Sequence, residues 1–248
     1  DAMKYINIIK DVIKQYGVGD ITSICGRFYA MDRDENWDRT KAYYDLVTLG
    51  KGLSSINIEK SIEGSYEKGI TDEFIKPIIC NKNTIKNGDI INVDVSTILN
   101  GYYSDASRMF SIGSISERAA KILSVTEECV ELGLKEAKPW GHLGDIAFAI
   151  NSHARDNGYS VVEDIGGHGI GLEFHEDPYV SYVTPKGSEM VLVPGMMFTI
   201  EPMINEGSPD FHVDEANGWT VYTIDGGLSA QIEYMVLITE RGAEVLTR

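Results

Sequence analysis

The amino-acid sequence predicts an α+β fold in which helices pack against a curved antiparallel sheet. Three observations support this prediction: residues 91–112 have the pattern of a β-hairpin, residues 116–135 and 143–156 have helical patterns, and the remainder is rich in short strands. Strands grouped before and after a pair of helices, rather than alternating with them, are typical of sheets that carry helices on one face. Residues 1–84 have a different pattern of helices and strands, described below.

The hairpin is the clearest local signal. Apolar and polar residues alternate from Ile91 to Ser96, the period of a strand with one apolar face. Asn100-Gly101 is a strong hairpin-turn dipeptide, and the segment from Tyr102 to Ile112 continues as the return strand. Asp94 therefore lies on the polar face of the first strand.

The two helices and the later strands follow from similar signals. The first helix stops before Pro139, and Gly158 closes the second. Further strands are expected at residues 160–163, 197–204, 220–224 and 229–239.

Residues 1–84 read as alternating helices and short strands. We expect a helix that ends at Tyr16, before Gly17, and further helices at 35–48 and 58–68. Residues 21–25 and 74–80 look extended, and Pro77 excludes a helix from the latter.

Composition narrows the classes of function. The formal net charge is -16, which argues against a nucleic-acid-binding surface, since that would need a basic patch. No apolar run reaches the length of a membrane span, and nothing resembles a signal peptide. The three cysteines are widely spaced and odd in number, which favours reduced thiols. We expect a monomeric, cytoplasmic protein with no membrane or nucleic-acid partner.

Asp94 and Asp105 are the first candidate ligands. They fall on paired strands of the hairpin, about one diagonal step apart. Two carboxylates this close raise each other's pKa unless a cation lies between them. The alternative is that one or both face water at a sheet edge, and for two isolated acids that alternative is the better one.

Three further residues change this balance. Glu201 and Glu233 each stand inside a strand with apolar neighbours, where a glutamate needs a partner. His168 is flanked by glycines, which let the backbone bend sharply and bring an imidazole close to a ligand; taken alone, it would be a loop residue. Oxygen ligands with one imidazole suit Mn, Fe, Co or Zn, and bridging carboxylates hold metal pairs ~3.5–4 Å apart.

At these residues the sequence from about 85 to 248 resembles the type I methionine aminopeptidases. The motifs that carry the resemblance are Asn87-Gly88-Asp89-Ile90-Ile91-Asn92-Val93-Asp94-Val95, the segment around Asp105, Gly167-His168-Gly169-Ile170-Gly171 with His175, Phe198-Thr199-Ile200-Glu201-Pro202-Met203, and Leu228-Ser229-Ala230-Gln231-Ile232-Glu233. The resemblance implies the pita-bread fold and a site for two divalent metal ions.

The resemblance also implies roles for the five ligands. Asp105 and Glu233 would bridge the metals, Asp94 would complete one site, and His168 with Glu201 would complete the other. Glu201 would also be the general base, activating a water molecule and passing its proton to the leaving amine.

Four other residues match positions that contact substrate in that family. His175 would hydrogen-bond the scissile carbonyl as it becomes an oxyanion, and Phe174, Trp219 and Gln231 would lie near the substrate pocket. Prolidases and proline-directed aminopeptidases share the ligand set, but the short segment from His168 to His175 and the compact size favour the methionine enzymes.

The first third departs from the family. A histidine expected just after Cys80 is absent, because the sequence there is Cys80-Asn81-Lys82-Asn83. Residues 1–84 instead resemble an internal fragment of cofactor-independent phosphoglycerate mutase. That resemblance is carried by Cys25-Gly26-Arg27-Phe28-Tyr29-Ala30-Met31-Asp32-Arg33-Asp34, Trp37-Asp38-Arg39, Lys41-Ala42-Tyr43 and Thr71-Asp72-Glu73-Phe74-Ile75-Lys76-Pro77. Arg27 and Arg33 match arginines that hold a phosphorylated substrate in the mutase, but away from that domain we interpret them as surface arginines.

The sequence therefore predicts a chimeric chain, joined near residues 84–89, with residues 85–248 as the catalytic region. The predicted function is a two-metal hydrolase that removes N-terminal methionine from peptides or nascent proteins. The missing histidine and pocket half predict weakened turnover and relaxed side-chain selectivity. The alternatives are a non-catalytic chimera that binds metal and, less favoured because its catalytic machinery is absent, mutase-type substrate binding.

Overall fold

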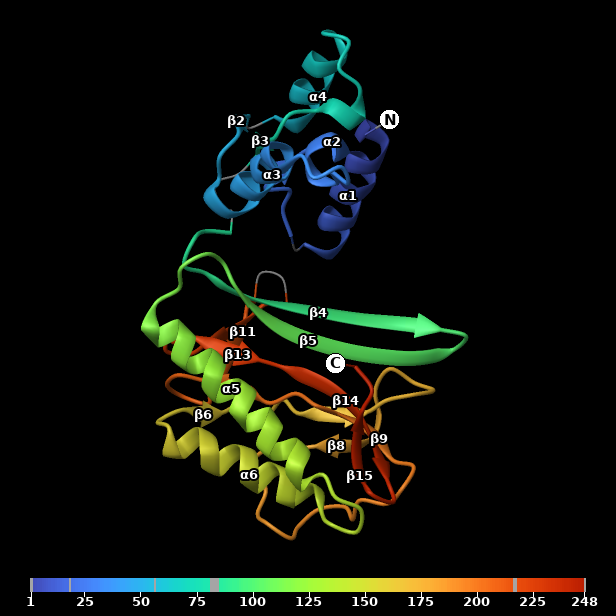
Figure 1. The fold of residues 1–248 in the computed structure, drawn as a ribbon, viewed down its shortest axis with the longest axis vertical. Coiled ribbons are helices and arrows are strands. Elements are labelled where there is room, and N and C mark those ends of the chain that lie inside the picture. Colours follow the sequence, from blue (N-terminus) through green and yellow to red (C-terminus); the bar gives the residue numbers. More distant parts are fainter. Residues whose placement is uncertain (1, 18, 56, 81–84, 216–217, 248) are drawn as a thin grey trace. The chain divides into compact units, whose positions relative to one another are not determined.

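The computed structural model describes residues 2–17, 19–55, 57–80, 85–215 and 218–247 (Figure 1). Its contacts divide the chain into two compact units. The first comprises Asp1–Asp89, Ile112–Ser114 and Asp214–Thr220, and the second comprises Ile90–Ser111, Ile115–Val213 and Val221–Arg248. Residues 81–84, where the family histidine is missing and the expected junction begins, lie outside the described residues. The assignment of residues 1–84 to another family stays a prediction.

The first unit packs helices around a small sheet. Its elements, in chain order, are α1 (Ala2–Tyr16), β1 (Ser23–Ile24), α2 (Arg27–Ala30), α3 (Trp37–Leu49), β2 (Leu53–Ser54), α4 (Ile58–Tyr66), the 3₁₀ helix η1 (Asp72–Phe74) and β3 (Ile78–Ile79). β3 lies between β1, its antiparallel partner, and β2, its parallel partner. Ile6, Ile62 and Ile75 are among the residues of its core.

The predicted segments of this unit are found with shifted boundaries. Residues 74–80 were expected to be extended, but they begin at the end of η1 and pair in a sheet only at Ile78–Ile79. Pro77 precedes the paired residues and has no N–H to donate. It is linked to β2 through its carbonyl, which accepts a hydrogen bond from the Leu53 N–H.

The second unit is built on a seven-stranded antiparallel sheet in the order β4-β5-β14-β9-β7-β8, with β15 on the same edge of β14 as β5. Its strands are β4 (Ile90–Leu99), β5 (Tyr102–Ser111), β7 (Gly167–Gly169), β8 (Glu176–Val180), β9 (Met197–Ile200), β14 (Glu233–Thr239) and β15 (Gly242–Val245). The curved antiparallel sheet backed by helices, predicted from the sequence, is confirmed. β7, β8 and β15 were not predicted.

Two helices cover this sheet. α5 (Glu117–Glu136) and α6 (Leu143–Asp156) lie side by side, as Figure 1 shows, and agree with the predicted helices to within one residue. The Ser116 side chain caps α5 by accepting from the Ala119 N–H. Ile122 and Ile146 from the helices and Phe198 from β9 are fully buried in one core. Among the described residues, no helix combines the length and apolar character that a membrane span requires.

Two of the predicted strands are broken in the middle. The segment 197–204 divides into β9 and β10 (Met203–Asn205), and 229–239 divides into β13 (Ser229–Gln231) and β14. β9 pairs with β14 in the large sheet, while β10 pairs with β13 and β6 (Ser160–Val161) in a small one. The two strands thus cross together from one sheet to the other, and Glu201 and Glu233 stand at the crossing.

The remaining pair, β11 (Phe211–Val213) and β12 (Val221–Thr223), forms a two-stranded ribbon. β4 is the edge strand of the large sheet, and the apolar side chains of its outer face, such as Val93 and Val95, are exposed. The alternation of residues 91–96 therefore gives a strand, as predicted, whose apolar face is not buried.

Gly169 gives a test of the packing between β7 and β8. A Cβ built there would lie 2.1 Å from the Asp177 carbonyl oxygen, and this contact is with backbone that cannot turn aside. Gly169→Ala is expected to lower the free energy of unfolding by about 2 kcal/mol or more. Gly64→Ala is the control: it lies in helix α4 with nothing within 4 Å of the added methyl group, so it should keep or raise stability. Denaturant unfolding followed by circular dichroism compares them, and equal stability of the two variants would contradict the packing.

Candidate metal centre

Asp94 and Asp105 lie diagonally across the hairpin. The register places Asp94 opposite Ser107 and Ser96 opposite Asp105, which confirms the predicted diagonal step. Asp105 is buried and accepts a hydrogen bond from the Ser96 hydroxyl at 3.0 Å. Loss of hydration and the negative charge of Asp105 both raise the pKa of Asp94.

His168 is held by close packing of β7 against its neighbours. A Cβ at Gly167 would lie 2.5 Å from the Thr199 carbonyl oxygen, and one at Gly169 would meet the Asp177 backbone. Neither glycine has a positive φ, and the register with β8 is interrupted between His168 and Gly169, so a local irregularity lies where a bend was expected. The glycines are also needed because other backbone approaches them closely. The imidazole Nδ1 lies 3.0 Å from the Gly169 carbonyl oxygen, which leaves Nε2 for a ligand.

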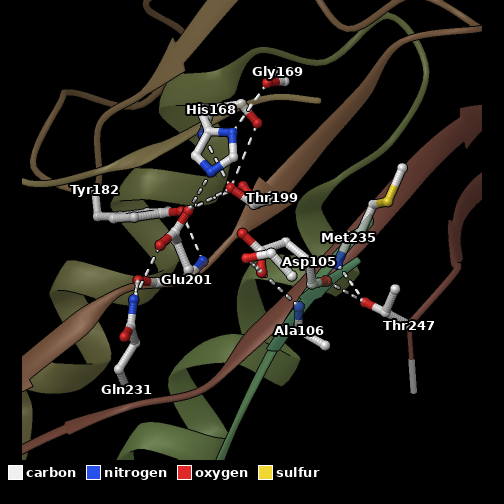
Figure 2. Close-up of polar contacts among 11 residues, drawn as sticks. Asp105, Ala106, His168, Gly169, Tyr182, Thr199, Glu201, Gln231, Met235 and Thr247 are labelled. Atoms are coloured by element: carbon white, nitrogen blue, oxygen red, sulfur yellow. Dashed lines mark hydrogen bonds and ion pairs between the residues drawn. The ribbon is translucent and has the colours of Figure 1, made fainter. Parts of the chain in front are cut away.

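Glu201 directly follows β9, and two side chains orient its carboxylate. The Thr199 hydroxyl donates to Oε1 at 2.6 Å, and the Gln231 amide donates to Oε2 at 3.0 Å. The same Thr199 hydroxyl accepts the His168 N–H at 3.0 Å, so one hydroxyl joins two candidate ligands. His168 Nε2 lies 3.4 Å from Glu201 Oε1 (Figure 2).

Glu233 is the most buried of the five candidate ligands. It is 1% exposed, and neither of its carboxylate oxygens has a hydrogen-bond partner among the described residues. A buried carboxylate without a partner must either take up a proton or neutralise a cation. Burial raises the pKa of Glu233 to about 9, and the charges of Glu201 and Asp105 act in the same direction.

The five candidate ligands come together from four strands and from the residue that directly follows a fifth. One ligand atom each of Asp105, His168 and Glu233 lies within 4.8 Å of the others, Glu201 touches His168, and Asp94 adjoins Asp105. Figure 2 shows His168, Glu201 and Asp105 converging from three elements. Several acids, one imidazole and an orphaned buried carboxylate fit a divalent metal site. The assignment of each residue as a ligand stays a prediction.

The electrostatics of the cluster favour the binding of a cation. Burial raises the pKa of Glu201 to about 7, opposed by the hydrogen bonds from Thr199 and Gln231. Burial also lowers the pKa of His168, so the neutral imidazole that metals require is favoured.

His175 and Phe174 lie beside the cluster. The ring centroids of His175 and His168 are 4.2 Å apart, and those of Phe174 and His175 are 4.3 Å apart. The His175 side chain is exposed, which is consistent with a group that contacts substrate rather than metal.

The other two predicted substrate residues, Gln231 and Trp219, differ in how their positions relate to the cluster. Gln231 contacts the Glu201 carboxylate directly, so its place in the site is clear although its contact with substrate stays a prediction. Trp219 belongs to the segment Asp214–Thr220, which groups with the first unit, and its proximity to the cluster stays a prediction.

Sequence reasoning gave no role to Thr199 or Tyr182. Thr199 stands two residues before Glu201, a spacing that puts both on one side of a strand, so the pattern could have identified it. The buried hydroxyl of Tyr182 accepts the Glu201 N–H at 2.8 Å, and no sequence signal links these two residues.

Glu233→Gln tests the electrostatic argument. In metal-free protein the folded state binds a proton on Glu233 more tightly than the unfolded state does. Its stabilising contribution is therefore full below a pH of about 4.5 and is lost as pH rises toward 9. The melting temperature of chelator-treated wild type should fall over this range more steeply than that of Glu233→Gln. The variant should be the more stable one at pH 9, and it should bind metal poorly. Parallel pH profiles would contradict the argument.

Comparisons with known proteins identify the family. The model of the family described as Metallopeptidase family M24 matches residues 40–240. Methionine aminopeptidase A of Synechocystis is 48% identical over 178 residues, covering 70% of each chain, and methionine aminopeptidase 1 of Bacillus subtilis is 40% identical over 185 residues, covering 75% of this chain and 74% of its own. The crystal structure of the Rickettsia prowazekii methionine aminopeptidase superposes with a TM-score of 0.65 at 42% identity over 66% of each chain. The prolidase of Pyrococcus horikoshii superposes with a TM-score of 0.53 at 29% identity, covering 68% of this chain and 43% of its own. The chain belongs to metallopeptidase family M24.

Proposed function

We propose that this protein is a metal-dependent aminopeptidase that removes the N-terminal methionine from peptides or nascent proteins. The observation that carries the proposal is the buried, unpartnered carboxylate of Glu233 inside a cluster of acids and one imidazole. The relatives with 40–48% identity described above are named methionine aminopeptidases, which supports methionine as the residue removed.

Asp94, Asp105, His168, Glu201 and Glu233 would hold two divalent metal ions. Of these residues, Asp105 and Glu233 are both buried and come from the neighbouring strands β5 and β14, so both would lie close to the bound ions. When bound, such a pair activates water at neutral pH and neutralises negative charge that develops on a carbonyl oxygen. Mn, Fe, Co and Zn all suit these ligands.

The protein's own groups then have separate tasks. Glu201, whose carboxylate accepts hydrogen bonds from Thr199 and Gln231, would take a proton from the attacking water and pass it to the leaving amine. His175, exposed beside His168, can donate a hydrogen bond to the carbonyl oxygen of the scissile bond. Thr199 and Gln231 keep the Glu201 carboxylate in one orientation, which supports fast proton transfer.

The origin of the first third is a separate part of the proposal. We propose that residues 1–84 derive from a phosphoglycerate-mutase-like fragment, on the strength of the motifs around Arg27 and Asp72. The family model begins its match at residue 40, within this segment, so the two assignments overlap over 40–84. Arg27 pairs with Glu73 on the surface, which favours a structural role over phosphate binding.

Turnover of a Met-Gly-Met peptide tests the proposed function. With added Mn²⁺ or Co²⁺ the chain should release free methionine, a chelator should stop the release, and the N-acetylated peptide should not react. Turnover is expected to be weak and tolerant of other side chains, because no histidine precedes Asp94 in the sequence. Two bound metals without turnover would leave the non-catalytic reading, and absence of metal binding would end the proposal.

His175→Ala tests the role of this histidine. Loss of an oxyanion hydrogen bond should lower kcat by about 10²- to 10³-fold with little change in KM. Metal stoichiometry should stay unchanged, because His175 is not a proposed ligand. His212→Ala removes another exposed histidine, which stacks on Tyr222 in the β11–β12 ribbon, and should leave kcat unaltered. Equal activity of the two variants would rule out the oxyanion role.

A further inference from the structure

The ladder of hydrogen-bonded pairs between β14 and β5 stops before Asp105, a candidate bridging ligand. Along one edge of β14, β5 pairs with Glu233 and Tyr234, and β15 pairs with the residues from Val236 onward. Met235 lies between these two ladders. Continuing the register would place it opposite Asp105, yet no ladder pair joins the two residues.

The side chain of Thr247 fills this gap. Its hydroxyl accepts the Met235 N–H at 2.9 Å and donates to the Asp105 carbonyl oxygen at 2.9 Å (Figure 2). One hydroxyl thus replaces a direct backbone hydrogen bond between β14 and β5. The Leu246 N–H donates to the Met235 carbonyl at 2.8 Å, which keeps Thr247 in register with β14.

Arg108 completes the arrangement from β5. Its guanidinium donates to the Glu233 carbonyl at 2.5 Å and to the Thr247 carbonyl at 2.7 Å, and it stacks over the Tyr234 ring with 4.1 Å to the centroid. The planar fork of arginine can hold two carbonyls at once. Arg108 and Thr247 together form a clasp around the backbone of Asp105 and Glu233.

We propose that this clasp of Arg108 and Thr247 sets the position of Asp105 relative to Glu233 and thereby the affinity for the metal pair. Both are positioning residues, since they bind backbone of the ligand-bearing strands and not the carboxylates. The inference rests on the proposed function. Contacts that support metal ligands without touching the metal typically change metal affinity by about 10- to 100-fold. The position of a carboxylate also depends on the backbone that bears it, so contacts that fix this backbone affect the metal site.

Thr247→Val tests the clasp. Valine keeps the shape of threonine but leaves the Asp105 carbonyl and the Met235 N–H without partners. We expect Mn²⁺ affinity, measured by calorimetry on the full chain, to fall about 10-fold or more. The visible spectrum of bound Co²⁺ should change as well, because it reports the coordination geometry. Thr247→Ser keeps the hydroxyl, so its Mn²⁺ affinity and its Co²⁺ spectrum should match those of the wild type. Arg108→Lys, which loses the planar fork, should also weaken binding.

Thr239→Val is the matched control. The Thr239 hydroxyl, at the other end of β14, donates to the Gly242 carbonyl at 2.7 Å and accepts the Arg241 N–H at 3.2 Å. It should lose comparable stability and keep full metal affinity. If Thr247→Val melts lower but binds Mn²⁺ with unchanged affinity and an unchanged Co²⁺ spectrum, the residue is structural and the clasp is overturned. If the unaltered chain binds no metal, the proposed function fails, and the clasp with it.

Discussion

The central constraint in this protein is the repulsion among four carboxylates that the fold brings to one place. Glu233 has no partner for either oxygen among the described residues, and Asp105 is buried beside it. Water cannot screen charges in such a position, so the folded chain carries a stored electrostatic cost. A protein keeps a cost of this kind where it serves a function. A bound cation would relieve this cost, and the binding of metal and the stability of the fold would then be linked.

Paired strands and side-chain hydroxyl groups hold the candidate ligands in place despite this repulsion. Every candidate ligand stands in a strand or directly after one, and neighbouring strands fix the distances between them. Hydroxyl groups then link ligands that belong to different strands: Thr199 joins His168 to Glu201, and Thr247 joins Asp105 to β14. His175 differs, because it lies in a segment between β7 and β8 and is exposed. The candidate ligands are thus held by strands, while the candidate substrate-binding histidine lies in an exposed connecting segment.

Much of the fold could be predicted from the sequence where the signal is local. The hairpin of β4 and β5 and both helices follow from periodicity and turn residues, and the diagonal approach of Asp94 to Asp105 follows from the hairpin. The meeting of β5 with β14 and of β9 with β7 does not, because nothing in an isolated strand specifies a distant partner. β7 escaped prediction because it has three residues, two of them glycine. Thr247 acts on Asp105 across a large separation in sequence, where no periodicity applies. Phe174 and His175 were identified through family resemblance alone.

The crossing of strands between the two sheets also determines which part of the chain can change in length without moving Glu201 and Glu233. After Glu201 the chain enters β10, makes an excursion through residues 206–228 and returns in β13 just before Glu233. The pairing of Met203 with Gln231 and of Asn205 with Ser229 closes the base of this excursion. Lengthening a loop whose ends are already paired costs little free energy, since the cost grows only with the logarithm of its length. Changes in the length of the segment 206–228 are therefore expected to leave the two glutamates in their places.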